Sequence, residues 1–520
     1  MVAGVKPDSS GTLGRIALNP ELRSQLEAEL DRHWIRLTLL VWVGVTVYYV
    51  WSNWGYVRWL SLGDTDDNMR LMQVRGLLAG QGWYDLTNYR LNPPMGFNIH
   101  WSRIVDLPIA GMILFFRLFT TNAWAERLAC GIAPLIPLSI TMVGIGATVR
   151  RLVHPLAWPL AIIFLLGTSV TMLMYLPDRI DHHGSQLAML SLTVAGLCDP
   201  KPVRGGLIVG LSSAVSISIG LEMLPYAAFA GAIQTLRWIW DRRESTRLAV
   251  YAVALGGGTA LGFAGFASYA NYAMRCDALT PVYLTVMVAA GVLLFALAWI
   301  NPERRGVRLG LAVLAGAVIV AGFAHFFPQC LGRPEQVSPE LQRNWLDNVR
   351  EAKPIYKHPF RLAFPMAALP IVGVFGVALG TWRARRTRAL LGWTCVALFV
   401  IFASLMLLWQ VRVAPAAQLM AIPGSVAIAW LLLPWLLNHG SMPVRVFGTV
   451  GAFLIVSGLF AGLIIKYLPI DKPNAYVRRV NQATSGCIRT TVLSKLNFYP
   501  AQTIFTFTDL GPRLIVLTHH

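Results

Sequence analysis

Runs of about 20 apolar residues recur along almost the whole chain, and this repetition restricts the possible folds more than any motif does. A run of that length crosses the roughly 30 Å hydrocarbon core of a bilayer as an α-helix, because a helix satisfies its own backbone hydrogen bonds. Apolar residues make up 55% of the 520 positions and charged residues only 13%, a balance that a soluble surface does not accommodate. The sequence therefore predicts an all-α polytopic membrane protein.

The basic residues gather in short loops between the apolar runs, although a formal net charge of +19 alone would suggest a nucleic-acid partner. This is the positive-inside pattern of membrane proteins, so we expect membrane lipids and no nucleic acid as partners. With residues 1–33 in the cytoplasm, each expected inner turn is basic and the C-terminus lies outside. The sequence predicts about thirteen spans, near residues 34–53, 128–149, 155–174, 185–198, 205–222, 223–240, 248–270, 281–300, 307–327, 361–381, 389–409, 412–436 and 446–466.

Three polar segments are left on the outer side, and they differ from the inner loops by carrying acids, histidine and aromatic residues. They cover residues 54–127, 175–184 and 328–360. Within the first of them, the moderately apolar piece Leu107–Phe119 is too charged for a span, so we expect an amphipathic helix in the outer interface. Any chemistry should lie in these segments.

The expected transmembrane domain covers residues 34–466, and a short extracytoplasmic segment, 467–520, follows it. That segment stops directly after an apolar stretch, so a longer natural chain remains an open alternative. Cys276, Cys330 and Cys487 are all expected on the outer side, where a disulfide can persist. We expect a bridge between Cys276 and Cys330, which both sit just beyond spans, and two buried thiols are the alternative.

The first outer segment carries three acids within four positions, at Asp64, Asp66 and Asp67. Asp64 is well placed as the N-cap of a short helix that ends near Gly80, and capping alone would explain it. The same cluster also suits a cation or the activation of an incoming nucleophile. Both interpretations remain open from the residues alone.

The second outer segment places ionisable groups beside the bilayer, where they are costly and usually face a polar cavity. Its cluster contains Asp178, Arg179, Asp181, His182 and His183. In an irregular turn a carboxylate and an imidazole can converge on one ion, and this pair of ligands suits Mn²⁺ or Zn²⁺ better than Ca²⁺. A helix cap with an interfacial salt bridge is the alternative.

Two further charges are ambiguous when taken singly. Glu351 belongs to the third outer segment, and on spacing alone a solvated loop with a short amphipathic helix explains that segment. Arg412 lies at the outer boundary of two long apolar runs, where a guanidinium can reach for headgroups or clamp the phosphate of a lipid donor.

Taken in order, these segments resemble the catalytic subunit family of oligosaccharyltransferases, membrane enzymes of the GT-C fold that move a glycan from a polyprenyl or dolichyl carrier to asparagine. The resemblance covers about residues 34–436 in order and topology. The residues that carry it are Asp64, Asn68 and Arg70, then Gly82, Trp83 and Tyr84, then Pro94 and Gly96, then Asp181, His182, His183 and Gly184, then Asn348, Val349, Arg350, Glu351 and Pro354, and finally Arg412.

The resemblance implies a GT-C-type bundle, a polyprenyl-linked sugar donor, and an acceptor glycan, lipid or protein. It also implies an inverting transfer assisted by a divalent cation, Mn²⁺ or Mg²⁺. The implied roles are catalysis for Asp64, Asp181 and Glu351, metal binding for Asp64, Asp181 and His183, phosphate binding for Arg412 and Arg179, and support for Asp66, Asp67, Arg70 and His182.

The chain departs from the family in three respects. His183 stands where the family has an acid, Arg350 and Lys353 flank Glu351, and the large C-terminal domain with a Trp-Trp-Asp signature that reads the acceptor sequon is missing. We therefore do not predict asparagine glycosylation. The alternatives are a single-sugar transferase that modifies lipid A, another envelope lipid or a polysaccharide, and a lipid-linked glycan transporter or flippase. The expected location is a bacterial inner (plasma) membrane with an extracytoplasmic active site.

Overall fold

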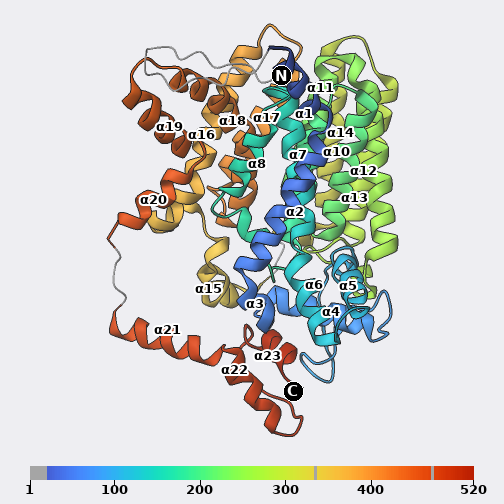
Figure 1. Cartoon of the computed structure of the whole chain (residues 1–520). Helices are drawn as coiled ribbons and strands as arrows, with labels where there is room; N and C mark the ends of the chain where they lie inside the picture. The colour runs from blue at the N-terminus through green and yellow to red at the C-terminus, as the bar shows by residue number, and fades with distance from the viewer. Residues whose placement is uncertain (1–19, 333–336, 470–473) are drawn as a thin grey trace.

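The computed structural model describes residues 20–332, 337–469 and 474–520. Residues 1–19 of the expected cytoplasmic segment therefore lie outside the described part, as do small pieces of the expected outer segments 328–360 and 467–520. The described residues are mainly helical, with two short strands, and the long helices stand side by side in one bundle (Figure 1). The prediction of an all-α polytopic membrane protein is confirmed.

Eight helical stretches in the described residues are long and apolar enough to cross a membrane, or nine if one bent pair is counted as a single span. The helices concerned are α2 (Trp34–Ser52), α6 (Asn122–Ile132) with α7 (Leu135–Leu152), α10 (Pro202–Ile219), α12 (Ser245–Phe266), α13 (Pro281–Ile300), α14 (Arg305–Phe326), α16 (Phe360–Ala384) and α18 (Ala414–Leu437). Each coincides with an expected span, and the full number of about thirteen stays a prediction.

Shorter helices complete the bundle. They are α8 (Trp158–Leu166), α9 (His183–Leu197), α11 (Leu224–Trp240), α17 (Leu390–Met406), α19 (Thr449–Val456) and α20 (Leu459–Tyr467). Two expected spans were wrong as single helices, because the helix in 155–174 ends at Leu166 and the span 446–466 is bent by 96° between α19 and α20. Gly458, with a φ of 77°, supplies the left-handed backbone at that bend.

The early end of α8 has a specific cause in the neighbouring helix α18. The backbone N–H of Val170 donates to Gln418 Oε1 at 3.1 Å, and the Thr171 hydroxyl donates to the carbonyl of Pro415 at 2.8 Å. Irregular backbone at membrane depth is tolerated where protein groups satisfy it in this way. A side chain and a backbone carbonyl of α18 thus take the place of the next helical turn of α8.

Close helix contacts in the bundle depend on glycine. A Cβ atom at Gly376 of α16 would lie 2.0 Å from the carbonyl oxygen of Gly424 on α18, and one at Gly206 of α10 would lie 2.4 Å from the carbonyl oxygen of Arg247 on α12. Small residues let the backbones of membrane helices approach closely, which strengthens their van der Waals packing.

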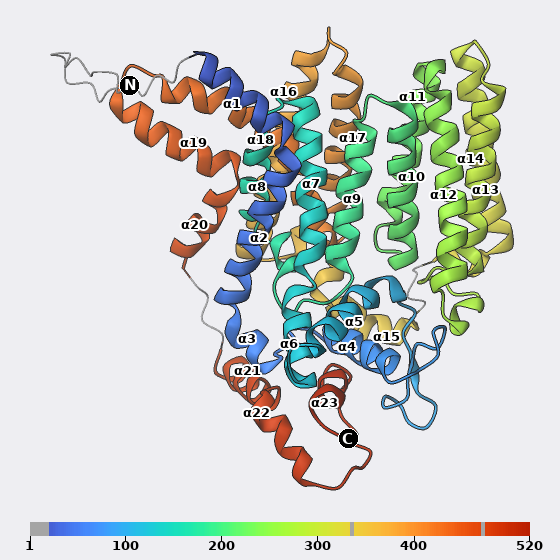
Figure 2. The same cartoon turned by 45° about the vertical axis from the view of Figure 1, so that its right-hand side comes forward.

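Most polar elements gather at the end of the bundle opposite α1 (Pro20–Arg32), as Figure 1 and Figure 2 show. They are α3 (Trp54–Trp59), α4 (Thr65–Leu78), the antiparallel strands β1 (Thr87–Asn88) and β2 (Phe97–Asn98), α5 (Arg103–Arg117), α15 (Pro339–Asn344), α21 (Ala475–Cys487), α22 (Thr490–Leu493) and α23 (Gly511–Leu517). The expected amphipathic helix corresponds to α5, which buries Val105, Ile109 and Ile113 on one face and begins four residues earlier than expected.

Two arginines attach α23 to the first outer segment. Arg75 of α4 donates to the carbonyl of Val516 at 2.9 Å, and Arg90 donates to the carbonyls of Ile515 and Thr518, both at 2.7 Å. Because the last carbonyls of a helix have no partner within it, such cations cap the C-terminus of α23. The C-terminal part of the chain is therefore anchored on α4 and the loop that follows it.

The expected disulfide is present. Cys276 and Cys330 are bonded, with Cα atoms 5.3 Å apart, and Cys487 is a free, exposed thiol. The bridge ties the segment before α13 to the segment after α14 at the end of the bundle that carries the polar elements.

Candidate active site

A cavity of about 2880 Å³ opens at the polar end of the bundle, between the outer segments. Its wall includes Asp64, His183, Glu351 and Arg412, which come from four separate parts of the chain. The sequence predicts a shared pocket for positions 64, 181 and 412. The side chains at 64 and 412 line the cavity, and Asp181 lies buried immediately behind its wall, next to His182 and His183.

Asp64 caps α4 and also takes part in an ion pair. Its Oδ1 accepts a hydrogen bond from the backbone N–H of Thr65 at 2.7 Å, while its Oδ2 accepts one from Arg179 Nη1 at 2.7 Å. Burial alone would raise the pKa of Asp64, but the hydrogen bond and charge of Arg179 and the bonds from Thr65 outweigh it and lower that pKa. The expected N-cap is confirmed, and the second oxygen points to a further role.

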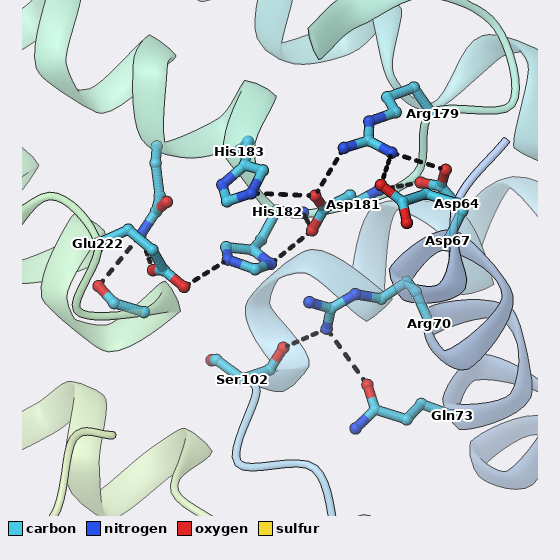
Figure 3. Close-up of polar contacts among 12 residues, drawn as sticks. Asp64, Asp67, Arg70, Gln73, Ser102, Arg179, Asp181, His182, His183 and Glu222 are labelled. Atoms are coloured by element: carbon cyan, nitrogen blue, oxygen red, sulfur yellow. Dashed lines mark hydrogen bonds and ion pairs between the residues drawn. The ribbon is translucent and has the colours of Figure 1, made fainter. Parts of the chain in front are cut away.

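Arg179 connects three carboxylates, as Figure 3 shows. Its guanidinium lies 2.7 Å from Asp64, 3.2 Å from Asp67 and 3.5 Å from Asp181. The planar fork of arginine suits such multiple pairing, and the three acids in turn raise the pKa of Arg179 against the effect of burial. Arg179, expected to bind donor phosphate, therefore holds the acids together in this structure.

The two oxygens of Asp181 face different partners. Oδ1 lies 2.6 Å from Nδ1 of His182, whereas Oδ2 lies 3.4 Å from Nε2 of His183 and 3.5 Å from Arg179. Its backbone N–H donates to Asp67 at 3.0 Å, which links this turn to α4. Burial disfavours the Asp181 carboxylate, but the charges of His182 and His183 and the hydrogen bond from His182 hold the pKa of Asp181 well below its usual range.

The acids beside this turn are harder to ionise. Burial, reinforced by the charges of Asp181 and Asp64, raises the pKa of Asp66 to about 6. Asp67 is fully buried, and burial raises its pKa to about 8 despite the charge of Arg179. Strongly shifted carboxyl groups beside a cavity are characteristic of functional sites.

His182 lies between two carboxylates. Its Nε2 is 3.0 Å from Glu222 Oε1, and its Nδ1 faces Asp181. Burial favours the neutral ring, but Asp181 and Glu222 outweigh it and raise the pKa of His182 to about 10. Glu222 was missed from the sequence, although an acid at the junction of the expected spans 205–222 and 223–240 is a signal that could have found it.

Arg70, expected to support the site, is buried beneath it. It pairs with Asp106 at 2.9 Å and donates to the carbonyl of Ser102 at 3.2 Å, and its guanidinium lies 4.7 Å from the ring centre of Trp101. Trp101 in turn contacts His182, with ring centres 5.3 Å apart. Arg70 thus stabilises the floor of the site without lining the cavity.

Glu351 and Arg412 form a hydrogen-bonded ion pair with each other. The pairing of their segments is fixed by backbone hydrogen bonds, from Val411 to Lys353 at 2.9 Å and from Ile355 to Leu407 at 3.0 Å. Both side chains are partly exposed to the cavity, at 54% for Glu351 and 34% for Arg412. The structure therefore places Glu351, the third expected catalytic acid, next to Arg412, the expected phosphate-binding residue. A ligand in the cavity can reach this pair.

The turn that contains Asp181, His182 and His183 can hold a divalent cation. Ligand atoms of Asp181, His182 and His183 all lie within 4.8 Å of one another. A carboxylate oxygen with imidazole nitrogens is a donor set for Mn²⁺ or Zn²⁺. Asp64, a further expected ligand, bonds to Arg179 and reaches this group through it.

No family model and no curated protein matches the sequence. Solved structures do match it: the oligosaccharyltransferase of Archaeoglobus fulgidus in its apo form is similar over 94% of this chain and 64% of its own, with a TM-score of 0.62 and 15% identity. A complex of the archaeal enzyme AglB from the same organism gives a TM-score of 0.64 at 14% identity, over 94% of this chain and 64% of that one. The chain has an oligosaccharyltransferase-like GT-C fold. It spans 64% of the length of these two solved chains.

Two of the similar solved structures contain ligands. The AglB complex contains an inhibitory peptide and a dolichol-phosphate. Another Archaeoglobus structure contains Zn and sulfate, and it is similar over 88% of this chain and 58% of its own, with a TM-score of 0.58 and 14% identity. At such identities the likeness establishes the fold of this chain and leaves its chemistry to its own residues.

Proposed function

We propose that this protein is a membrane glycosyltransferase that moves a sugar or glycan from a polyprenyl-phosphate or polyprenyl-diphosphate donor to an acceptor outside the cytoplasm. The observation that carries the proposal is the single cavity bordered by the Asp64–Arg179–Asp181 cluster and by the Glu351–Arg412 pair. The oligosaccharyltransferase-like fold supports the same conclusion.

The proposed reaction is an inverting displacement at the anomeric carbon. The acceptor atom forms a bond to that carbon as the bond to the phosphate oxygen breaks, and the acceptor proton passes to Asp64, which its low pKa keeps ionised. The lipid phosphate leaves with the electron pair, and the guanidinium of Arg412, which exchanges Glu351 for phosphate when donor binds, holds that phosphate near the membrane surface throughout.

A divalent cation held by Asp181 and His183 would neutralise charge on the leaving phosphate. The protein residues orient this site. Arg179 keeps Asp64 and Asp181 together, and Asp67 anchors the backbone of Asp181. Glu351, expected to be catalytic, acts in this scheme by holding Arg412 until donor binds.

The proposal covers more than one class of acceptor and donors with one or two phosphates. A single-sugar transferase acting on lipid A, another envelope lipid or a polysaccharide uses the same chemistry with a different acceptor. A bacterial inner (plasma) membrane is consistent with a disulfide at the cavity end and arginine-rich turns at the other end.

The test is transfer by the purified full-length protein from polyprenyl-phosphate and polyprenyl-diphosphate sugars to membrane-derived acceptors, followed by mass spectrometry. Asp64→Asn should lower the rate by about a hundredfold or more, because it removes a group that acts in the transition state. Asp347→Asn is the matched control, since Asp347 lines the same cavity outside the cluster. Full transfer by Asp64→Asn would reject the assignment, and donor movement across vesicles without transfer would support a flippase.

A further inference from the structure

Glu222 reaches the acid cluster from a part of the chain that none of the expected motifs includes. It lies in the short loop between α10 and α11, and its Oε1 is 3.0 Å from Nε2 of His182. The other nitrogen of the same ring lies 2.6 Å from Asp181 Oδ1. Glu222, His182 and Asp181 thus form a continuous carboxylate–imidazole–carboxylate chain, which Figure 3 displays.

The members of this chain are held in place from several sides. The side chains of His182 and Asp181 are only 2% and 1% exposed. Gln186 Nε2 donates to Glu222 Oε2 at 2.9 Å and to the carbonyl of Gly220 at 3.1 Å. With the ring of Trp101 packed against His182, neither the imidazole nor the two carboxylates can turn freely.

This arrangement leaves only one oxygen of Asp181 for the cavity side. Oδ1 accepts from the backbone N–H of His182 and lies 2.6 Å from its Nδ1, while Oδ2 lies 3.4 Å from His183 Nε2 and 3.5 Å from Arg179 Nη2. We infer that Glu222 and His182 are positioning residues: they fix Asp181 so that its Oδ2 and the ring of His183 present a preformed pair of ligands to a divalent cation. His182 then orients a ligand and is not itself a ligand.

The physical basis is general for metal sites. Ligands that are oriented by buried hydrogen-bonded partners bind metal more tightly, because less freedom is lost on binding, and removing such a partner typically weakens affinity by about 10- to 100-fold. The inference rests on the proposed function only in taking a divalent cation as the ligand. The alternative is that Glu222 and His182 merely stabilise the fold.

Binding of Mn²⁺ by the full-length protein in detergent, measured by electron paramagnetic resonance, tests the inference without any transfer assay. Glu222→Ala should weaken Mn²⁺ binding by about 10- to 100-fold. Glu222→Gln should weaken it less, because its amide oxygen still accepts from His182 Nε2. His183→Ala, which removes a ligand, should weaken it most. Asp277→Asn is the matched control, because Asp277 is another acid that lines the same cavity. The Mn²⁺ affinity of this variant should equal that of the wild-type protein.

Gly220 offers a second way to perturb Glu222 without altering it. A Cβ at Gly220 would lie 2.4 Å from Glu222 Oε2 and 3.2 Å from Gln186 Nε2, and the backbone there is extended, so Gly220→Ala should displace the Glu222 carboxylate and strain its bond from Gln186. We expect Gly220→Ala to lower Mn²⁺ affinity in the same direction as Glu222→Ala. If Glu222→Ala does not fold, Gly220→Ala and Glu222→Gln decide the question by the same measurement.

The outcomes separate this inference from the proposed function. Wild-type affinity in Glu222→Ala or in Gly220→Ala would overturn the positioning role. Absence of Mn²⁺ binding by the wild-type protein would also overturn it, while transfer by the same preparation would leave the proposed function standing. In the transfer assay, raising Mn²⁺ should restore the rate of Glu222→Ala, whereas a loss caused by misfolding would not respond to the metal.

Discussion

A buried charge network lies at each end of helix α9, and the two differ in composition. Before α9, Asp181 is bonded to Arg179 and His182 beside the cavity. After α9, Asp199 pairs with Arg151 at 2.8 Å and with Arg204 at 2.7 Å. Both acids are almost inaccessible to solvent, so burial and pairing alone do not distinguish the two ends.

The balance of charge does distinguish them. The network before α9 has more acids than cations, with Asp64, Asp66, Asp67, Asp181 and Glu222 around Arg179 and His182. The network after α9 has more cations than acids, with Arg151, Arg204, Arg237 and Arg247 around Asp199 and Glu244. Only the acid-rich network borders the cavity.

The difference shows what a buried ion pair can and cannot indicate. In the network after α9 each acid is paired with arginines away from the cavity, and structure explains these pairs, because removing one partner leaves a costly uncompensated charge. A surplus of acid next to a cavity costs stability and therefore points to a ligand that supplies the missing positive charge. Function is assigned here on the surplus and the cavity together.

The sharpest test compares Asp181→Asn with Asp199→Asn. Asp181→Asn should lower transfer by about a hundredfold or more with little change in the unfolding temperature. Asp199→Asn should instead cost about 3 kcal/mol of stability, because Arg151 and Arg204 lose the buried carboxylate that they share, while each folded molecule keeps its transfer rate. Transfer rates and thermal unfolding of both variants in detergent would decide it, and the reverse pattern would contradict the comparison.

A smaller effect on transfer is expected at Arg412, whose partner Glu351 is 54% exposed, whereas the Asp199 side chain is fully buried. Arg412→Lys keeps the charge but loses the planar fork, so KM for the donor should rise about tenfold with kcat little changed. Arg350→Lys is the control, because Arg350 lines the same cavity outside the Glu351–Arg412 pair. An unchanged KM with a lower kcat would show that Arg412 acts in another way.

The smallest effect on transfer is expected at Asp178, three residues before Asp181. Both of its carboxyl oxygens are buried without a hydrogen-bond partner among the described residues, its φ is 67°, and burial raises its pKa to about 7. An acid whose pKa is raised on folding makes the folded state less stable as pH rises, here between about 4 and 7. Asp178→Asn should therefore become more stable than wild type as pH rises through this range, by up to about 4 kcal/mol at pH 8, because the carboxyl pKa rises by about 3 on folding, and transfer should be unchanged.

Thermal unfolding of Asp178→Asn and wild type across that pH range is the measurement. A loss of transfer in Asp178→Asn as large as that in Asp181→Asn would mean that the whole turn, and not its surplus of ionised acid, is required.

The fold was largely predictable because apolar runs and arginine-rich turns determine the positions of spans through residues that are close together in the sequence. The ends of α13 coincide with the expected span, and the bridge between Cys276 and Cys330 followed from topology. The break after α8 was not predictable, since it depends on Gln418 from a distant helix. The bend at Gly458 depends on one backbone angle, and a glycine inside an apolar run is equally compatible with a straight helix.

The candidate site was predictable in its residues but not in its bonds. Asp64, Asp181, His183, Glu351 and Arg412 were singled out by the family resemblance, and all of them except Asp181 line the cavity. The pairing of Arg179 with three acids and of Glu351 with Arg412 depends on three-dimensional packing that spacing does not encode. Glu222 escaped notice because a single acid at a span junction resembles an ordinary loop residue.

The anchoring of α23 has a consequence for the order of biogenesis. Arg75 holds the carbonyl of Val516, which is 441 positions later in the sequence. During synthesis the first outer loop must therefore wait for nearly every span to be inserted before its last contacts form. The wall of the cavity closes only after the membrane bundle is complete, so a partly made chain lacks the finished cavity.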